Sequence, residues 1–391
     1  MAELSLPQRN RICSIDVLRG ITIFLMVFVN DLAGVNGAPW WMRHFPSDGD
    51  GMTFVDLVFP AFLFVMGMSI PAALGKRLDA GKRWFEVLPH VLIRSASLLV
   101  IGVLMVNNPG DERMGWHAGL WGLLMYSAVF LVWHTFPSGS NRAKLISGIL
   151  RWTGAVALIL LALVFRNPEG DWLRTQWYGI LGLIGLAYLI ASLVYLVFRD
   201  NRTALTGVMA LLFCVYIAFR EGLLRSEWFG GGMVGSHPAI AVGGVFLGTL
   251  LYGKDLSPAD RRKAALALIG FAAAAAWLLR PLYGIGKNPA TPSWCLWSIA
   301  ITAAVWVLLH VAVDMHPHER PFRPFRFLGT NPLFAYLLAP LVYCGFQAAG
   351  LNYDGLGDLG FPAGLARSAV FTLVICGIAA GAARGGVRLK L

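Results

Sequence analysis

One histidine lies in a short polar loop between two membrane-length apolar runs, and an aspartate follows it twelve positions later. The histidine is His44, in the sequence GAPWWMRHFPSDGDGMTFVD, and Asp56 opens the second run. Histidine exchanges protons near neutral pH, so it can act as a general base, and its ring can also carry an acyl group. Asp56, at the mouth of the second run, is the best candidate to orient the ring; alternatively, it caps the following helix. His44 is therefore a candidate catalytic base or acyl carrier; the alternative is a solvated loop histidine without a role in catalysis.

The first apolar run carries a cation and an amide on one helical face. Arg19 and Asn30 are eleven residues apart, which is about three helical turns and roughly 16 Å along the axis. Ionisable groups at the ends of apolar spans are functional candidates because their burial is costly. Such a face suits a long polyanionic ligand that passes through the membrane. Alternatively, Arg19 extends to the lipid headgroups and only marks the cytoplasmic side.

Two further segments carry groups that could contact a substrate. Trp40 and Trp41 precede His44 and would serve either as an interfacial aromatic belt or as a platform on which a sugar stacks. The sequence KNPATPSW combines Lys287 with Ser293 and Trp294 just before another apolar run. We expect these five residues to be substrate-binding candidates.

Basic residues and an amide also lie near the start of the apolar run at 326–346. Arg323 and Arg326 precede the sequence FLGTNPLFAY, which contains Asn331. They would bind phosphates on the cytoplasmic side, although the positive-inside rule explains the arginines equally well. The two histidines of HPH at 316–318 have no third or fourth ligand nearby, so we predict no metal site.

The elements that must position these residues are membrane-spanning helices. The 391-residue chain is 57% hydrophobic and 14% charged, with a mean hydropathy of +0.65, whereas a soluble protein has about 25% charged residues. A span needs about 20 apolar residues. We predict an all-α polytopic membrane helix bundle of about twelve spans, with ten to twelve as the range. The predicted spans are 14–33, 54–74, 87–106, 116–136, 145–165, 178–198, 203–220, 237–252, 262–281, 294–314, 326–346 and 362–383.

No linker or polar domain interrupts these runs, so we predict a single integral membrane domain over residues 1–391. The run at 237–252 is short and rich in glycine, and we expect a broken or re-entrant helix there. The N-terminus lacks the features of a cleaved signal peptide. The five cysteines show no metal-binding spacing, and we expect no disulfides.

The distribution of lysine and arginine predicts the topology. Of the 32 basic residues, 22 fall on one predicted side and 9 on the other, with Arg94 inside a span. This bias puts both termini in the cytoplasm and the His44 loop on the periplasmic or outer side of an inner membrane. The net charge of +11 is thus mainly a topology signal, and the chain lacks the basic, aromatic-rich stripe typical of nucleic-acid binding. The expected environment is a lipid bilayer.

The same segments resemble a known family. SIDVLRGITIFLMVFVN, the Trp-rich loop with His44 and DLVFPAFLFVMGMSI together resemble the heparan-α-glucosaminide N-acetyltransferase family and its bacterial relatives. KNPATPSW and LGTNPLFAY resemble later segments of that family. The resemblance is concentrated in a motif core at 11–74 and 284–345, with extra helices within 145–220. The LRGI start also resembles a wider group of membrane acyltransferases, with Asn30 where those have histidine.

The resemblance implies an acetyl-CoA-dependent acyltransferase with a transmembrane acyltransferase-like fold. The acetyl group would pass from cytosolic acetyl-CoA to an amino sugar or glycan outside, by N- or O-acetylation. His44, Asn30 and Asp56 would be the catalytic residues, with Asn30 bonding the thioester carbonyl. The cofactor-binding candidates would be Arg19, Arg323, Arg326 and Asn331. The chain departs from the family pattern at GLWGLLMY (119–126) and SHPAIA (236–241).

Two alternatives stay open from the sequence. Twelve spans with both ends inside is a common plan for a secondary transporter of a small solute, although we find no internal repeat. A catalytically degenerate family member that only binds or scaffolds is the second alternative. The sequence also leaves a homodimer open.

Overall fold

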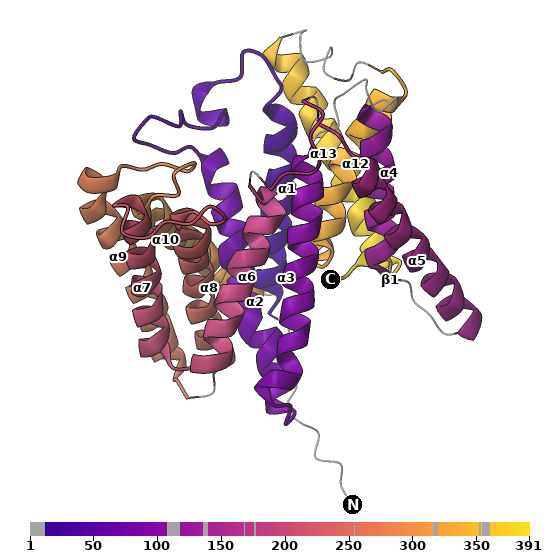
Figure 1. Cartoon of the computed structure of the whole chain (residues 1–391). Helices are drawn as coiled ribbons and strands as arrows, with labels where there is room; N and C mark the ends of the chain where they lie inside the picture. The colour runs from indigo at the N-terminus through magenta and orange to yellow at the C-terminus, as the bar shows by residue number, and fades with distance from the viewer. Residues whose placement is uncertain are drawn as a thin grey trace, which may run out of the picture. The chain divides into compact units, whose positions relative to one another are not determined.

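The computed structural model describes residues 12–107, 118–135, 140–167, 169–175, 177–253, 255–315, 320–351, 353 and 360–391. Its regular structure is almost entirely helical, which confirms the all-α prediction (Figure 1). The helices are α1 (Cys13–Leu32), α2 (Phe54–Asp79), α3 (Trp84–Val106), α4 (Ala118–Trp133), α5 (Asn141–Val164), α6 (Gly179–Phe198), α7 (Arg202–Arg220), α8 (His237–Tyr252), α9 (Pro258–Tyr283), α10 (Pro292–His310), α11 (Arg323–Gly329), α12 (Pro332–Ala348) and α13 (Phe361–Arg384). The shorter elements are η1 (Trp40–Met42), η3 (Gly232–Ser236), η4 (Val311–Met315), η5 (Arg320–Phe322), β1 (His134–Thr135) and β2 (Arg388–Leu389).

Membrane-length helices dominate the described part of the chain. Ten helical runs there are long and apolar enough to cross a bilayer. The pair α11 and α12 would form an eleventh span, and α4, with 16 residues, is shorter than the roughly 20 that a span needs. Each of the twelve predicted spans therefore corresponds to a helix or a helix pair. The chain is a multi-pass membrane protein.

The broken helix lies elsewhere than predicted. Residues 237–252 belong to a continuous run from Gly232 to Tyr252, whose first turn, η3, is π-helical and which is mostly buried. The bend occurs instead between α11 and α12, whose axes differ by 74°. Pro332 follows the bend at the first turn of α12, a position that proline favours because its missing N–H needs no partner there.

The helices divide into two compact units. Unit 1 takes its described residues from 1–18, 40–96 and 183–320. In this unit α2 packs tightly on α8, where a β-carbon at Gly67 would overlap the backbone of Ala241 and one at Gly244 would overlap that of Phe64. Small residues let membrane helices approach at backbone distance. The glycines of the 237–252 segment therefore serve close packing rather than a break.

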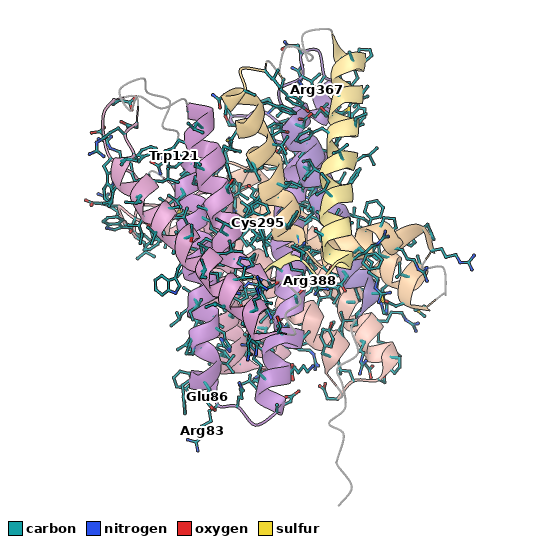
Figure 2. All side chains as sticks on the ribbon, turned by 90° about the vertical axis from the view of Figure 1, so that its right-hand side faces the viewer. Arg83, Glu86, Trp121, Cys295, Arg367 and Arg388 are labelled. Atoms are coloured by element: carbon teal, nitrogen blue, oxygen red, sulfur yellow. The ribbon has the colours of Figure 1, made fainter. Side chains whose placement is uncertain are left out.

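Unit 2 comprises residues 19–39, its described residues in 97–182, and those in 321–391. Here α4 packs between α5 and α12, and Trp121 (Figure 2) donates from its indole nitrogen to the Leu161 carbonyl at 3.3 Å. α13 packs on α11 and α12. β1 and β2 form a short antiparallel pair that holds the segment around Arg388.

Candidate active site

His44 and Asp56 form a hydrogen-bonded pair at the start of α2 in unit 1. The Nδ1 atom of His44 lies 2.7 Å from Oδ1 of Asp56. The Asp56 side chain is 1% exposed and that of His44 is 46% exposed. A buried carboxylate thus holds an accessible imidazole. When Nδ1–H donates to a carboxylate, Nε2 carries the free lone pair and is the atom that can take a proton.

Asp56 also takes part in capping α2, so the two roles considered for it from the sequence coexist. Thr53 is the N-cap residue, and its hydroxyl accepts from the Val55 amide at 3.2 Å. The second carboxylate oxygen of Asp56 accepts from the amides of Thr53 and Phe45, both at 3.0 Å. This is a capping box with aspartate in the usual glutamate position. One oxygen therefore fixes the helix start while the other orients His44.

A second carboxylate joins the His44 loop to the loop that precedes α10. Asp50 accepts from the Ile285 amide at 2.7 Å and from Nε of Arg280 at 3.0 Å. The amide of Gly51 donates back to the Ile285 carbonyl at 3.0 Å. The Ile285 amide and the Arg280 guanidinium hold the pKa of Asp50 below its usual range. Two loops more than 200 residues apart in sequence are thus connected at their backbones.

This connection brings Lys287 to the histidine. Its Nζ atom lies 3.1 Å from Nδ1 and 3.2 Å from Nε2 of His44. Burial lowers the pKa of Lys287 from its usual value, and the negative charge of Asp56 partly opposes that shift. The structure therefore places a cation, an imidazole and a carboxylate together. This set can accept a proton and stabilise a negative charge on a reacting oxygen.

Thr291 shapes the lysine loop. Its hydroxyl caps α10 by accepting from the Trp294 amide at 3.4 Å, accepts from the Gly286 amide at 3.0 Å, and lies 3.0 Å from the Gly284 carbonyl. Gly284 has a φ of 65°, a conformation in which glycine is favoured because it has no β-carbon. The loop from α9 into α10 is thus fixed around Lys287.

The hydrogen bond between the Asp50 carboxylate and the Ile285 amide should determine how rigid the loop before α10 is. Replacing Asp50 with alanine removes the acceptor of the Ile285 amide, so we expect that amide to exchange with solvent about tenfold faster. Arg280→Gln should change the exchange rate far less, because exposed ion pairs contribute about 0–1 kcal/mol. Hydrogen–deuterium exchange measured by mass spectrometry compares the two variants. Equal exchange in Asp50→Ala and the wild type would contradict this role for Asp50.

The other predicted substrate-binding residues in unit 1 differ in exposure. Trp40 and Trp41 are 73% and 48% exposed, and Trp41 packs on Phe54 at the start of α2. Ser293 and Trp294, in the first turn of α10, are fully buried. The exposed pair is compatible with either a lipid belt or a stacking platform, whereas the buried pair must act inside the unit.

The predicted cofactor-binding residues gather around α11 in unit 2. Arg19 donates from Nη1 to the Gly329 carbonyl at the end of α11, at 3.0 Å. Arg323 is exposed and Arg326 is half-buried. Gly20, next to Arg19, has no side chain to separate α1 from the backbone of Phe325. The structure therefore brings these three arginines to one short helix.

Asn331 has a structural use in the bend between α11 and α12. Its side-chain nitrogen donates to the Val387 carbonyl at 3.1 Å, and its oxygen accepts from the Leu389 amide at 3.2 Å. Asn331 is buried, with 1% exposure, so both ends of its amide are engaged by the C-terminal segment. Asn331 therefore has a structural use in the bend, and its role in binding the cofactor stays a prediction from the sequence.

Asn30 is exposed near the end of α1, also in unit 2. The residue after it, Asp31, is buried and accepts hydrogen bonds from the hydroxyls of Tyr343 at 2.6 Å and Tyr353 at 2.8 Å. Arg367, on α13 (Figure 2), lies 3.5 Å from the other carboxylate oxygen. This network anchors the end of α1 that carries Asn30, whose catalytic role stays a prediction from the sequence.

Sequence reasoning missed Asp50, Thr53 and Arg280. Only Thr53 had a local signal, because a threonine three residues before an acidic residue at the start of an apolar run is a capping pattern. The remaining contacts join distant segments and leave no signature in spacing. The histidines at 316–318, for which no metal site was predicted, lie outside the described residues.

Comparison with known proteins confirms the resemblance seen in the motifs. Residues 11–228 match the family described as "Domain of unknown function (DUF5009)". The chain is 42% identical over 103 residues to heparan-alpha-glucosaminide N-acetyltransferase of Homo sapiens, a stretch that covers 26% of this chain and 14% of the human protein. The Mus musculus protein of the same name is 41% identical over 98 residues, covering 25% and 14%. The aligned stretch is thus a small part of each relative.

Proposed function

This chain belongs to the DUF5009 family and is related to the heparan-alpha-glucosaminide N-acetyltransferases, and from that premise we propose that it is a membrane acetyltransferase. The donor is acetyl-CoA on the cytosolic side. The acceptor is an amino sugar or glycan on the other side of an inner membrane. The contact of His44 with Asp56 and Lys287 is the observation that carries the proposal.

The chemistry assigns one role to each of these three side chains. As the acceptor nitrogen or oxygen attacks the thioester carbonyl carbon, Nε2 of His44 takes its proton. A C–N or C–O bond forms, the C–S bond breaks, and the proton returns from His44 to the departing thiolate. Asp56 holds the ring in the required tautomer and stabilises the imidazolium. An acetylated His44 would use the same nitrogen as a nucleophile, so both routes depend on this residue.

Lys287 stabilises the negative oxygen that develops on the carbonyl. Its ammonium already lies against the imidazole, and a fixed cation in a partly buried site stabilises such an oxygen strongly. We propose a catalytic role for Asn30 on the basis of its motif position alone.

The arginines around α11 are the proposed site for the phosphates of CoA. Arg323 is exposed and Arg326 lies one turn further along the same helix. Arginine binds phosphate through paired N–H donors, which favours it for this role. Arg19 supports that helix by binding its last carbonyl, which is a favourable position for a cation.

Acetyl transfer by the purified protein tests the proposal. The protein in detergent is incubated with radiolabelled acetyl-CoA and a panel of amino sugars and glycans, and the products are identified by mass spectrometry. We expect acetylated product to appear only with both substrates present. Failure to acetylate every acceptor, together with solute uptake by proteoliposomes without acetyl-CoA, would favour a transporter instead.

The pH dependence should report on Lys287. A lysine whose pKa is lowered keeps its charge below that value and loses it as the pH rises through it, earlier than an ordinary lysine at about 10.4. The acetyl-transfer rate of the wild type should therefore fall as the pH becomes alkaline. Lys287→Arg should not show this fall, because arginine stays charged. Lys287→Met should reduce turnover by about 10²–10³-fold at neutral pH. If the rate of Lys287→Arg fell at alkaline pH as that of the wild type does, the fall would belong to the titration of another group.

A further inference from the structure

Several buried polar atoms in unit 1 have no hydrogen-bond partner among the described residues, and three of them belong to the starts of α8 and α10. They are Nδ1 of His237, Oγ of Ser293 and Nε1 of Trp294. His237 is 7% exposed, and Ser293 and Trp294 are fully buried. A buried polar atom without a partner is costly, so each of these three requires an explanation such as internal water, a ligand or catalysis.

Packing of the His237 ring connects these residues to α2, the helix that carries Asp56. The His237 ring packs edge-to-face between Phe59 and Trp294, with centroid distances of 5.3 and 6.3 Å. Phe59 is three residues after Asp56 on α2, one helical turn further into the unit. A β-carbon on Gly232 would contact Ala290, on the lysine loop, and lie 3.8 Å from Cε1 of His237. His237 therefore packs on the turn of α2 that follows Asp56, and Gly232 adjoins both the His237 ring and the loop that carries Lys287.

The donor and acceptor types define what these atoms would recognise. The indole of Trp294 only donates, whereas the serine hydroxyl and a neutral imidazole can donate or accept. A ligand group that both accepts and donates hydrogen bonds, such as a hydroxyl or an amide, can pair with these three atoms. None of the three side chains provides a fixed charge, so a charged group would find no counter-charge among them.

We propose that His237, Ser293 and Trp294 form an inner subsite that binds an uncharged hydroxyl or amide group of the acceptor. This inference rests on the proposed function and adds to it the group that positions the acceptor for attack. The acceptor's reacting atom would lie at His44, and a neighbouring polar group would reach inward to the three unpartnered atoms.

The test begins with His237→Phe, which keeps an aromatic ring between Phe59 and Trp294 and removes both ring nitrogens, Nδ1 included. With glucosamine as acceptor, we expect the KM for the sugar to rise about tenfold, the loss of roughly one hydrogen bond, and the KM for acetyl-CoA to stay unchanged. Ser293→Ala, which removes only one hydroxyl, should raise the KM for the sugar in the same way. For the wild type, one of the monodeoxy glucosamines should be a poorer substrate than glucosamine. For His237→Phe, that deoxy sugar and glucosamine should be equally good substrates.

Thermal stability separates binding from a structural role. Because Nδ1 of His237 has no partner among the described residues, His237→Phe should leave Tm unchanged or raise it. His310→Phe is the matched control, since His310 binds Asp314 at 2.7 Å and stacks on Trp306, and its Tm should fall. An unchanged sugar KM in both His237→Phe and Ser293→Ala would overturn the proposal. A comparable fall in Tm for His237→Phe with unchanged KM would also overturn it, and would indicate structural internal water.

A separate measurement applies if the wild type acetylates no sugar. In that case the proposed function fails, and the subsite is judged by the shift in Tm that glucosamine or N-acetylglucosamine produces. A shift in the wild type that His237→Phe lacks would support the subsite. The absence of any shift in the wild type, or an equal shift in both proteins, would overturn it.

Discussion

His44→Ala is expected to reduce acetyl transfer by about 10²–10⁴-fold while the protein keeps its fold. The side chain is 46% exposed, so its removal leaves no large cavity. Asp56 still accepts from the Thr53 and Phe45 amides without the histidine, and the start of α2 stays capped. The rate constants with acetyl-CoA and the best acceptor, together with Tm, measure the two effects.

The chain offers a matched control for this variant. His310 is also bound to an aspartate through Nδ1 at 2.7 Å, and its side chain is 33% exposed. His310→Ala should transfer acetyl groups at nearly the wild-type rate, because no proposed step uses that pair. Near-normal turnover in His44→Ala, or an equal loss in both variants, would refute the assignment of His44 as the base or acyl carrier.

Asp56 should show the second large effect, on both stability and activity. Asp56→Ala leaves the buried Thr53 amide and the half-buried Phe45 amide without an acceptor, and we expect the free energy of unfolding to fall by about 2–4 kcal/mol. Asp56→Asn keeps the volume and can still accept from the amides, but it no longer selects the tautomer of His44. We expect Asn at this position to cost about 10²-fold or more in turnover with a smaller loss of stability.

Unfolding in detergent, followed by circular dichroism, and steady-state rates measure these changes. Asp48→Asn serves as the control, since Asp48 is an exposed carboxylate in the same loop. Its stability and turnover should stay close to those of the wild type. If Asp56→Asn retained full turnover, the pairing with His44 would be structural only.

The helices could be predicted from the sequence because each one is a long apolar run. Where the prediction failed, at 237–252, the glycines had a use that composition cannot reveal. Gly244 lies where α8 meets the backbone of α2, a contact between segments about 180 residues apart. The bend between α11 and α12 was missed because Asn331 holds it through residues near the C-terminus. The side of the membrane on which each loop lies stays a prediction from charge.

The candidate site was predictable only where it is local. His44 and Asp56 are twelve residues apart, and a loop joined to a helix start limits how far they can separate. Lys287 was identified as a substrate-binding candidate, but its contact with His44 spans 243 positions and depends on Asp50 and Ile285. His237 gave no signal, because a single histidine in an apolar run looks like an ordinary core residue.

The long connection through Asp50 has a consequence for how the protein matures. Membrane helices are inserted from the N-terminus onward, so the histidine and its aspartate emerge early, within the part that matches the family. Arg280 and Lys287 follow only after some 230 further residues. A nascent or truncated chain would hold the acid–base pair without its cation. The complete constellation therefore forms late in biogenesis, when most of the bundle is already in the bilayer.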